Sequence, residues 1–303
     1  MSRPVNLSVV PVPVLFCADP LNPRRVDDHF AAQADAVRAA GGTVGLIDHD
    51  ALTRGDADAA VRRLPRGLGP AWYRGWMIGA DRYGDLASAL ADKDGELVVP
   101  QEFYRRAHEL PGWYGTFASL TPRSVWMASP AGVVPPPARL AELVAPLLDA
   151  TDGTRRSAVV KDFVKSRKHE WHEACFVPSL DKVDELHAVV ARMVELQEDA
   201  LAGGIVVRAF EDFDPDGEAR VWWVDGEPVL VTPHPDTPDL FREPDLDGVG
   251  PPVRALGCRF VTTDLARRVD GTWRVVEVGD GQVSDLPGTV DPYPLMDRLV
   301  RAG

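Results

Sequence analysis

The stretch FVTTDLARRVDGTWRVVEVGDGQ, residues 260–282, contains two β-rich runs separated by Asp270 and Gly271. An Asp-Gly pair between apolar runs is typical of a tight β-hairpin. Asp264 and Glu277 lie on its two arms, 277 − 264 = 13 residues apart, so a hairpin would bring both carboxylates side by side. Two carboxylates on one face of a sheet repel each other unless a cation or hydrogen bonds compensate them. The stretch therefore predicts a site for a hard divalent cation such as Mg²⁺, whose shell the phosphates of a nucleotide would complete.

A second group of charges precedes this hairpin. Lys161 follows a short apolar run, so we expect it at the end of a buried strand, where an ammonium group without an anionic partner is costly. The stretch KDFVKSRK (161–168) adds Lys165, Arg167 and Lys168, which makes four cations within eight residues of a chain with a formal charge of −13. This predicts a local site for an anion. A solvent-exposed hairpin tip is the alternative interpretation.

Between these two groups lies a third candidate element. The β-rich stretch GIVVRAFE (204–211) is followed by Glu218 and Arg220 in the run EARVWWV (218–224). The end of an extended strand can offer backbone N–H and C=O groups to the edge of an adenine ring. A nearby carboxylate can accept hydrogen bonds from both ribose hydroxyls. This element is a weak predictor of nucleotide binding when it is taken alone.

Composition excludes several classes of function. The chain has 303 residues, with 33 basic and 46 acidic side chains. A negative field of this size repels phosphate backbones and anionic lipid, which disfavours a DNA-binding or membrane-surface role. Three cysteines without a CxxC pair predict a reducing compartment and no set of structural disulfides. No segment has the roughly 18 apolar residues that span a membrane, and no signal peptide is recognisable, so we expect a soluble, cytoplasmic protein.

The pattern of predicted elements changes near the middle of the chain. Residues 1–150 alternate between β-rich runs and amphipathic helices, which is typical of a small α/β domain with a mostly parallel sheet. Residues 151–303 combine one long predicted helix, 181–202, with several β-rich runs, which predicts an α+β domain with an antiparallel sheet. The polar segment 151–156 marks the boundary. The segment 233–256, rich in proline and aspartate, is interpreted either as a binding loop or lid, or as a plain surface excursion.

The order of these features resembles the nucleotide-binding half of the ATP-grasp superfamily. A strand lysine, a cationic loop, a long helix, a β-rich stretch, a hairpin with Glu and a hairpin with Asp before Glu follow one another over residues 157–287. The stretches YRGWM (73–77), HELPGWY (108–114) and TPRSVW (121–126) are similar to those of one subgroup of that superfamily. The resemblance implies an ATP-grasp-like fold, in which a small N-terminal α/β domain precedes the nucleotide-binding domain.

The resemblance also implies roles for individual residues. ATP and Mg²⁺ would be the cofactors, with Lys161 on the phosphates and Asp264 and Glu277 as metal ligands. The other implied nucleotide contacts come from a mobile phosphate-covering loop, an adenine hinge and its flank, and a ribose carboxylate: Lys165, Ser166 and Lys168; Val206, Val207, Arg208, Ala209 and Glu211; and Glu218. Two positions depart from the family. The hinge has Arg208–Ala209 where acidic residues are frequent, and Gly279 stands where a metal-binding Asn is common, so that Asp280 or Gln282 would substitute as ligand.

The implied function is an ATP- and Mg²⁺-dependent carboxylate–amine ligase. A carboxylate would attack the γ-phosphate with Lys161, Lys168 and Arg220 as catalytic residues, and an amine would then convert the acylphosphate into an amide. The substrates would be amino acids or small peptides, bound by arginine forks and by residues after the metal turn: Arg220, Arg259, Arg74, Gln282 and Ser284. We expect no nucleic-acid or membrane partner, and the family is compatible with a homodimer. A phosphotransferase of the same fold and a nucleotide-binding interaction protein without turnover are the alternatives.

Overall fold

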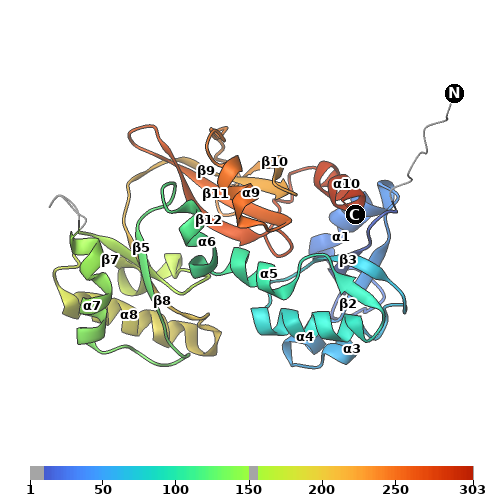
Figure 1. Ribbon diagram of the computed structural model, residues 1–303, viewed down its shortest axis with the longest axis horizontal. Helices are drawn as coiled ribbons and strands as arrows, with labels where there is room; N and C mark the ends of the chain where they lie inside the picture. The colour runs from blue at the N-terminus through green and yellow to red at the C-terminus, as the bar shows by residue number, and fades with distance from the viewer. Residues whose placement is uncertain (1–9, 150–155, 303) are drawn as a thin grey trace. The chain divides into compact units, whose positions relative to one another are not determined.

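The computed structural model describes residues 10–149 and 156–302, without the side chains of residues 216 and 217. Contacts between residues divide the chain, drawn in Figure 1, into two compact units. Unit 1 consists of Met1–Ala107, Asp216–Asp264 and Val278–Gly303, and unit 2 consists of His108–Pro215 and Leu265–Glu277. Both units are therefore assembled from segments that are separated in the sequence.

This division differs from the boundary near residue 150 that composition predicts, and that boundary itself falls outside the described residues. Unit 2 includes two elements that precede it, strand β5 (Ser124–Ala128) and helix α7 (Pro137–Asp149). Strand β5 pairs with β8 (Gly204–Ala209), and α7 packs against α8 (Val183–Gln197). Hydrogen bonding to a distant strand decides which unit an element joins, and local composition carries no information about that pairing.

A four-stranded parallel sheet in the order β2-β1-β3-β4 forms the first half of unit 1. Its strands are β1 (Val14–Cys17), β2 (Val44–Ile47), β3 (Gly69–Arg74) and β4 (Gly95–Leu97). The helices around it are α1 (Ala31–Ala39), α2 (His49–Thr53), α3 (Ala57–Val61), α4 (Ala80–Ala91) and α5 (Gln101–His108). Strand β1 is buried along its whole length, as the continuous apolar run predicts for a central parallel strand. The expected α/β fold with a parallel sheet is confirmed.

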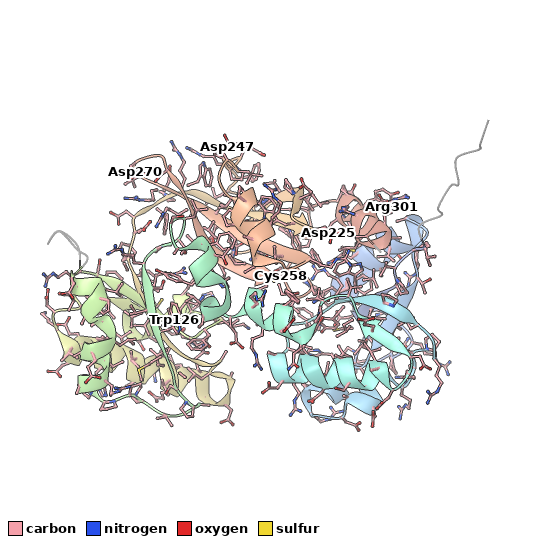
Figure 2. All side chains as sticks on the ribbon, viewed as in Figure 1. Trp126, Asp225, Asp247, Cys258, Asp270 and Arg301 are labelled. Carbon is pink, nitrogen blue, oxygen red and sulfur yellow. The ribbon has the colours of Figure 1, made fainter. Side chains whose placement is uncertain are left out.

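A second sheet has the order β10-β9-β11-β12. Its strands are β9 (Phe213–Val224), β10 (Glu227–Pro233), β11 (Phe260–Arg268) and β12 (Trp273–Asp280). The turn between β9 and β10 has positive φ angles at Asp225 (54°) and Gly226 (78°), the combination that a two-residue hairpin turn requires. Asp270 marks the second expected turn, between β11 and β12, and Figure 2 labels Asp225 and Asp270 at these two turns.

Two further helices belong to unit 1. Helix α9 (Gly250–Leu256) occupies the end of the segment 233–256, and α10 (Tyr293–Arg301) lies near the C-terminus. The Pro-rich part of that segment before α9 has no strand or helix of its own after β10. Its role as a lid stays a prediction.

The sheet of unit 2 is antiparallel and has the order β5-β8-β6-β7, with β6 at Ala158–Lys161 and β7 at Phe176–Val177. Helix α6 (Leu110–Phe117), three 3₁₀ or π turns (Lys168–Glu170, Trp171–Cys175 and Glu198–Ala200) and helices α7 and α8 complete the unit. Val160 and Val207 are fully buried in the core cluster that includes α7 and α8. Because side chains alternate along a strand, the neighbouring residues point to the other face of the sheet.

Among the described residues, none of the helices is both long enough and apolar enough to cross a membrane.

Candidate functional site

The second face of the unit 2 sheet carries charged and aromatic side chains. In the strand register Lys161 lies opposite Val206, and Val159 lies opposite both Arg208 and Phe176. Residues that lie opposite each other on neighbouring strands share a face, as do residues two positions apart on one strand. Lys161, Arg208 and Phe176 therefore share the face that does not pack against α7 and α8. The alternation that buries the valines also places two cations on this face.

Lys161 is the last residue of β6 and is buried, with 6% of its surface exposed. Its Nζ donates a hydrogen bond to the carbonyl of Val164 at 3.0 Å. Burial lowers the pKa of Lys161, whereas the negative charge of Glu277 raises it. One carbonyl satisfies only one of the three ammonium hydrogens, so this group is suited to bind an anion.

The loop that follows β6 is organised by Asp162, a residue for which the sequence analysis gives no role. Its Oδ1 accepts hydrogen bonds from the backbone N–H groups of Val164 and Lys165. Its Oδ2 accepts from Gln197 Nε2 at 2.8 Å and from the backbone N–H of Ala202 at 3.2 Å. Asp162 therefore ties the loop to the end of α8. An aspartate that directly follows a strand lysine is a signal for such a turn.

The predicted phosphate-covering residues lie on this loop. Lys165 and Lys168 are exposed, and Ser166 forms an isolated β-bridge with Lys161. Arg167 pairs with Glu170 at 2.8 Å and is thus already neutralised. The structure brings Lys161, Lys165 and Ser166 together, and their contact with a nucleotide stays a prediction.

The predicted adenine hinge lies in the central strand β8. Val206 and Arg208 pair with β5 on one side and with β6 on the other, and Val206 and Val207 are fully buried. Ala209 N–H donates to the carbonyl of Arg123, and Phe210 N–H donates to that of Ser157. The backbone of Val206–Ala209 is therefore consumed by the sheet, which differs from the sequence-based expectation. Backbone groups for a ligand become available only after Phe210.

Arg208 contributes its side chain instead. Its guanidinium is buried, donates to Ser124 Oγ at 3.1 Å and to the carbonyl of Val276, and lies over the ring of Trp113 at 5.7 Å. Burial lowers the pKa of Arg208 to about 10, and Glu277 opposes this shift. The group therefore stays cationic at neutral pH. Together with Lys161 it places two buried positive charges near the same carboxylate.

That carboxylate, Glu277, is half-buried on β12. Lys161, Arg208 and His108 are all within its electrostatic influence. Among the residues that the structure describes, Glu277 forms no hydrogen bond and no ion pair within 4.0 Å. A carboxylate that is surrounded by cations and paired with none of them directly has oxygen atoms available for a metal ion. The predicted position of Glu277 near Lys161 is thus observed, and its metal binding stays a prediction.

His108 is a further member of this group to which the sequence analysis assigns no role. It is buried, and burial together with the charges of Lys165 and Lys161 lowers its pKa to about 4, against the influence of Glu277. His108 is therefore neutral at pH 7. The residue stands at the start of the stretch HELPGWY, so its position in a quoted motif was the available signal.

Glu211, predicted to contact the nucleotide, is bound by arginines. Arg274 holds its two oxygens with Nε and Nη2, each at 3.0 Å, and Arg268 lies 3.7 Å away. Arg274 also donates to the carbonyls of Ser119 and Thr121. Glu211 therefore fastens the segment 265–277 to the remainder of unit 2, and a nucleotide contact from it stays a prediction.

The other carboxylate of the predicted metal pair, Asp264, belongs to unit 1. Arg220 binds it in a bidentate manner, with Nε–Oδ1 at 2.7 Å and Nη2–Oδ2 at 2.8 Å, and only 3% of the Asp264 side chain is exposed. Burial by itself would raise the pKa of Asp264, but the charge and hydrogen bonds of Arg220 hold it well below its usual range. A metal ion at Asp264 would therefore share these oxygens with Arg220.

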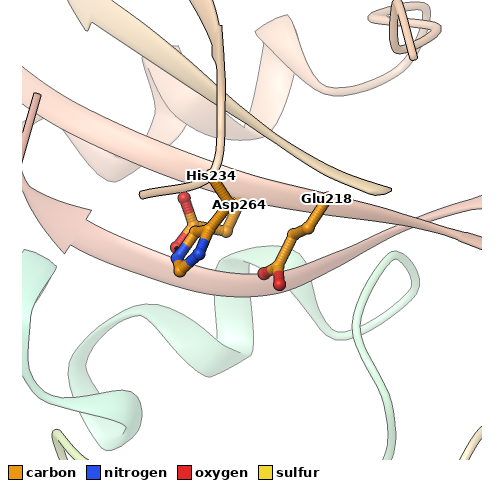
Figure 3. A group of neighbouring side chains, drawn as sticks. All are labelled: Glu218, His234 and Asp264. Carbon is orange, nitrogen blue, oxygen red and sulfur yellow. Dashed lines mark ion pairs between the residues drawn. The ribbon is translucent and has the colours of Figure 1, made fainter. Parts of the chain in front are cut away.

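Two more side chains converge on Asp264 (Figure 3). Ligand atoms of Glu218, His234 and Asp264 lie within 4.8 Å of one another. His234 Nε2 lies 3.5 Å from Asp264 Oδ2 and 3.1 Å from Arg220 Nη2. The sequence analysis names Glu218 but not His234, which stands in the segment 233–256 beside several prolines. Glu218 as a ribose ligand stays a prediction.

The predicted substrate residues all lie in unit 1, and three of them are used in its structure. Arg259 pairs with Asp225 at 2.7 Å and lies over the ring of Trp72 at 5.2 Å. Gln282 is fully buried and bonds the backbone of Tyr73, the hydroxyl of Tyr83 and Asp280. Ser284 Oγ lies 2.7 Å from Thr262 Oγ1 and donates to the carbonyl of Asp280. Their roles as substrate ligands stay predictions.

Arg74 differs from these three. It is 1% exposed, donates from Nη1 to the carbonyl of Gln282 at 3.1 Å, and lies between the rings of Phe30 (5.7 Å) and Trp222 (5.4 Å). Its Nε and Nη2 have no hydrogen-bond partner among the described residues. Burial lowers the pKa of Arg74 to about 10, and Asp285 opposes this shift. Arg74 therefore remains a cation with two unused donors.

Asp280, the third predicted metal ligand, points into the interior of unit 1. It is fully buried, its Oδ1 accepts from Gln282 N–H (2.9 Å) and Nε2 (3.0 Å), and its Oδ2 has no partner among the described residues. Burial raises the pKa of Asp280 to about 7. A metal-binding role for Asp280 stays a prediction.

The raised pKa of Asp280 gives a testable dependence of stability on pH. In the folded protein Asp280 keeps its proton up to about pH 7, whereas the unfolded chain loses it near pH 4, so stability falls as pH rises through this window. The contribution amounts to about 4 kcal/mol across the window. We expect Asp280→Asn to gain unfolding free energy relative to wild type from pH 4 to pH 8 in urea denaturation. The exposed Asp50→Asn is the control, and parallel curves for wild type and Asp280→Asn would contradict the assignment.

Comparison with known proteins places this geometry in a class. Residues 150–299 match the family model of an ATP-grasp domain, and the chain belongs to the ATP-grasp superfamily. The matching model describes the third family of one clade of that domain. No curated protein matches the sequence.

Several solved structures share the fold. D-cycloserine synthetase DcsG superimposes with a TM-score of 0.60 at 18% identity, over 95% of this chain and 99% of the other. A RimK domain ATP-grasp protein from Sphaerobacter thermophilus DSM 20745 gives a TM-score of 0.58 at 13% identity, over 95% and 99%. The ATP-grasp ligase PsnB with its precursor peptide PsnA2 and AMPPNP gives 0.56 at 12% identity, over 100% of both chains. At these identities the likeness shows the fold alone.

Proposed function

We propose that this protein is an ATP- and Mg²⁺-dependent ligase that joins the carboxylate of an amino acid or small peptide to an amine. The observation that carries the proposal is the group of Lys161, Arg208 and Glu277 on one face of the unit 2 sheet, in a chain that contains an ATP-grasp domain. Structures with the same fold support it. They include PsnB with Mg and ADP, and the macrocyclase MdnC of Microcystis aeruginosa MRC with its precursor peptide.

The residues present fit a nucleotide with a bound metal ion. Lys161 and Arg208 are buried cations, and the exposed Lys165 and Lys168 lie on the adjoining loop. Glu277 has carboxylate oxygens that no described residue bonds, and such oxygens are the preferred ligands of Mg²⁺. When bound there, Mg²⁺ would neutralise phosphate charge and orient the γ-phosphate.

In this proposal the side chains of unit 2 act mainly by electrostatics. The substrate carboxylate attacks the γ-phosphate, and ADP leaves. Lys161 and Lys168 stabilise the negative charge on the transferring phosphoryl oxygens, because a fixed cation in a site with little water stabilises such charge strongly. The acylphosphate then reacts with a neutral amine, and phosphate leaves as the amide forms. Arg220, which Asp264 and His234 hold in place, is the proposed anchor for an oxyanion of the substrate.

Glu277 provides a test of the metal site. We expect Glu277→Gln to raise the Mg²⁺ concentration that gives half-maximal nucleotide binding by roughly tenfold or more, because the amide removes a charged ligand. Calorimetric titration of Mg²⁺ into the protein with AMPPNP measures the change. Glu195→Gln on the exposed face of α8 is the control, since its side chain pairs only at the surface with Arg192. An unchanged Mg²⁺ titration would remove Glu277 from the metal ligands.

The ligase function is tested by products. A coupled assay of ADP release across the amino acids and dipeptides, with mass spectrometry of the mixtures, is expected to reveal ADP and phosphate in equal amounts together with an amide adduct that depends on an amine. ADP formation with a phosphorylated acceptor as the final product would establish the phosphotransferase instead.

One observation favours a second candidate, a nucleotide-binding protein without turnover. Arg220 occupies both oxygens of Asp264, so this carboxylate is already compensated without a metal ion. Mg²⁺-dependent binding of ATP without ADP formation across the whole substrate panel would support this second function. Turnover with any acceptor would exclude it.

A further inference from the structure

Arg74 carries an unusual energetic burden for a structural residue. Its guanidinium is 1% exposed, and the two rings beside it offer no hydrogen-bond acceptor to Nε and Nη2. Among the described residues no carboxylate lies within ion-pair distance of it. Burying a cation without a direct counter-ion costs several kcal/mol, in the range of about 3 to 5 for a broken buried pair. The arrangement is explained if a ligand supplies the missing anion.

The nearest negative charge belongs to Asp285, and it is only half engaged. Asp285 is the residue that most strongly supports the charged form of Arg74, yet its side chain is 49% exposed. Its Oδ1 accepts a hydrogen bond from His29 Nε2 at 2.8 Å, and its backbone carbonyl accepts from Arg220 Nη1 at 3.0 Å. No hydrogen bond to Oδ2 is present among the described residues. An acceptor that faces solvent therefore lies beside a cation that lacks a partner.

Aromatic rings fix the positions of both charges. The rings of His29 and Trp76 lie 4.6 Å apart, and Phe30 contacts Trp76 edge-on at 5.2 Å. Trp76 Nε1 donates to Asp27 at 2.9 Å, and 40% of the Trp76 surface is exposed. Phe30 also forms one wall of the Arg74 position. A cation and a carboxylate held by one rigid aromatic cluster match a small ligand that carries both charges.

We propose that Arg74 and Asp285 form a subsite for a free α-amino acid, whose carboxylate binds Arg74 and whose α-ammonium group binds Asp285. The inference rests on the proposed function and narrows it, since that function admits amino acids and peptides alike. In a peptide the nitrogen next to the terminal carboxylate is a neutral amide, which gives Asp285 no charge to bind. Asp285 is thus a specificity-determining residue that favours the free amino acid.

Binding measured without nucleotide tests this subsite independently of catalysis. The twenty common amino acids are titrated singly into the full-length protein by calorimetry, and the tightest one is compared with its N-acetyl derivative and its methyl ester. We expect the free amino acid to bind at least tenfold more tightly than either derivative. Asp285→Asn should weaken binding of the free amino acid about tenfold, equivalent to 1.4 kcal/mol, and leave the N-acetyl derivative unchanged. Arg74→Lys should weaken binding of the free amino acid and the N-acetyl derivative, and leave the methyl ester unchanged.

Asp35→Asn is the matched control, because Asp35 forms an exposed pair with Arg38 on α1, and its affinity should equal that of wild type. Equal binding of the free and N-acetyl forms, an equal loss of both in Asp285→Asn, or no binding of any amino acid would overturn the subsite. ADP release with dipeptides alone would also overturn it while the ligase function stands. Amino-acid binding without ADP release would leave the subsite in place and remove the ligase function.

Discussion

Replacement of Lys161 by methionine is expected to lower ADP formation by about 100-fold or more while the protein remains folded. The Nζ of Lys161 is buried, donates one hydrogen bond to the carbonyl of Val164, and lies within the influence of Glu277. Methionine has a similar length and no charge, so the change removes the cation and retains most of the packing. The rate is measured in the coupled ADP assay with the substrates that the screen identifies.

Two controls separate the loss of the charge from a loss of structure. Lys182→Met removes an exposed lysine next to α8 that pairs with Glu185, and its ADP rate should match that of wild type. The melting temperature of Lys161→Met should not fall, because a buried ammonium group with one hydrogen bond stabilises the fold little. ADP formation near the wild-type rate in Lys161→Met would show that Lys161 has no part in phosphoryl transfer.

Replacement of Arg220 by methionine is expected to destabilise the protein by about 3 to 5 kcal/mol, because it leaves the buried Asp264 carboxylate without its counter-ion. The pair is bidentate, and the two side chains are only 11% and 3% exposed. Urea denaturation at pH 7 gives the change in unfolding free energy. Arg38→Met, which removes one partner of an exposed ion pair on α1, should change it by less than about 1 kcal/mol.

A double mutant distinguishes a lost pair from lost packing. Combining Arg220→Met with Asp264→Asn removes the stranded charge, so the double mutant should recover about half or more of the lost stability. Additive losses in the double mutant would show that the two side chains contribute independently, and the ion pair would then not be the cause.

Much of the fold can be predicted from local sequence. The apolar run of β1, the Asp-Gly turn at 225–226 and the amphipathic stripe of α8 each correspond to observed elements. The end of the long helix is harder to locate. The pattern predicts a helix over 181–202, whereas α8 ends at Gln197 and Glu198 takes a positive φ of 47°. The apolar stripe continues past that point, so periodicity alone does not locate the end of the helix.

The candidate site is predictable only in part. The sequence identifies Lys161 and Glu277, because a lysine after an apolar run and a carboxylate on a hairpin strand are visible locally. It does not identify Asp162, His108 or His234, whose roles come from residues far away in the chain. It places the adenine contact on the backbone of Val206–Ala209, which both neighbouring strands consume in the sheet.

The amino-acid sequence by itself determined the strands, most of the helices, the order of charged groups along the chain and hence the superfamily. The tertiary structure alone decided the partner of each buried charge. It pairs Asp264 with Arg220, brings Glu277 near Lys161, and leaves Arg74 with two unused donors among the residues described. The physical reason is one of range. Periodicity and turn chemistry act over a few residues, whereas the energy of a buried charge depends on whichever group, of any sequence position, the packed chain brings within a few ångströms.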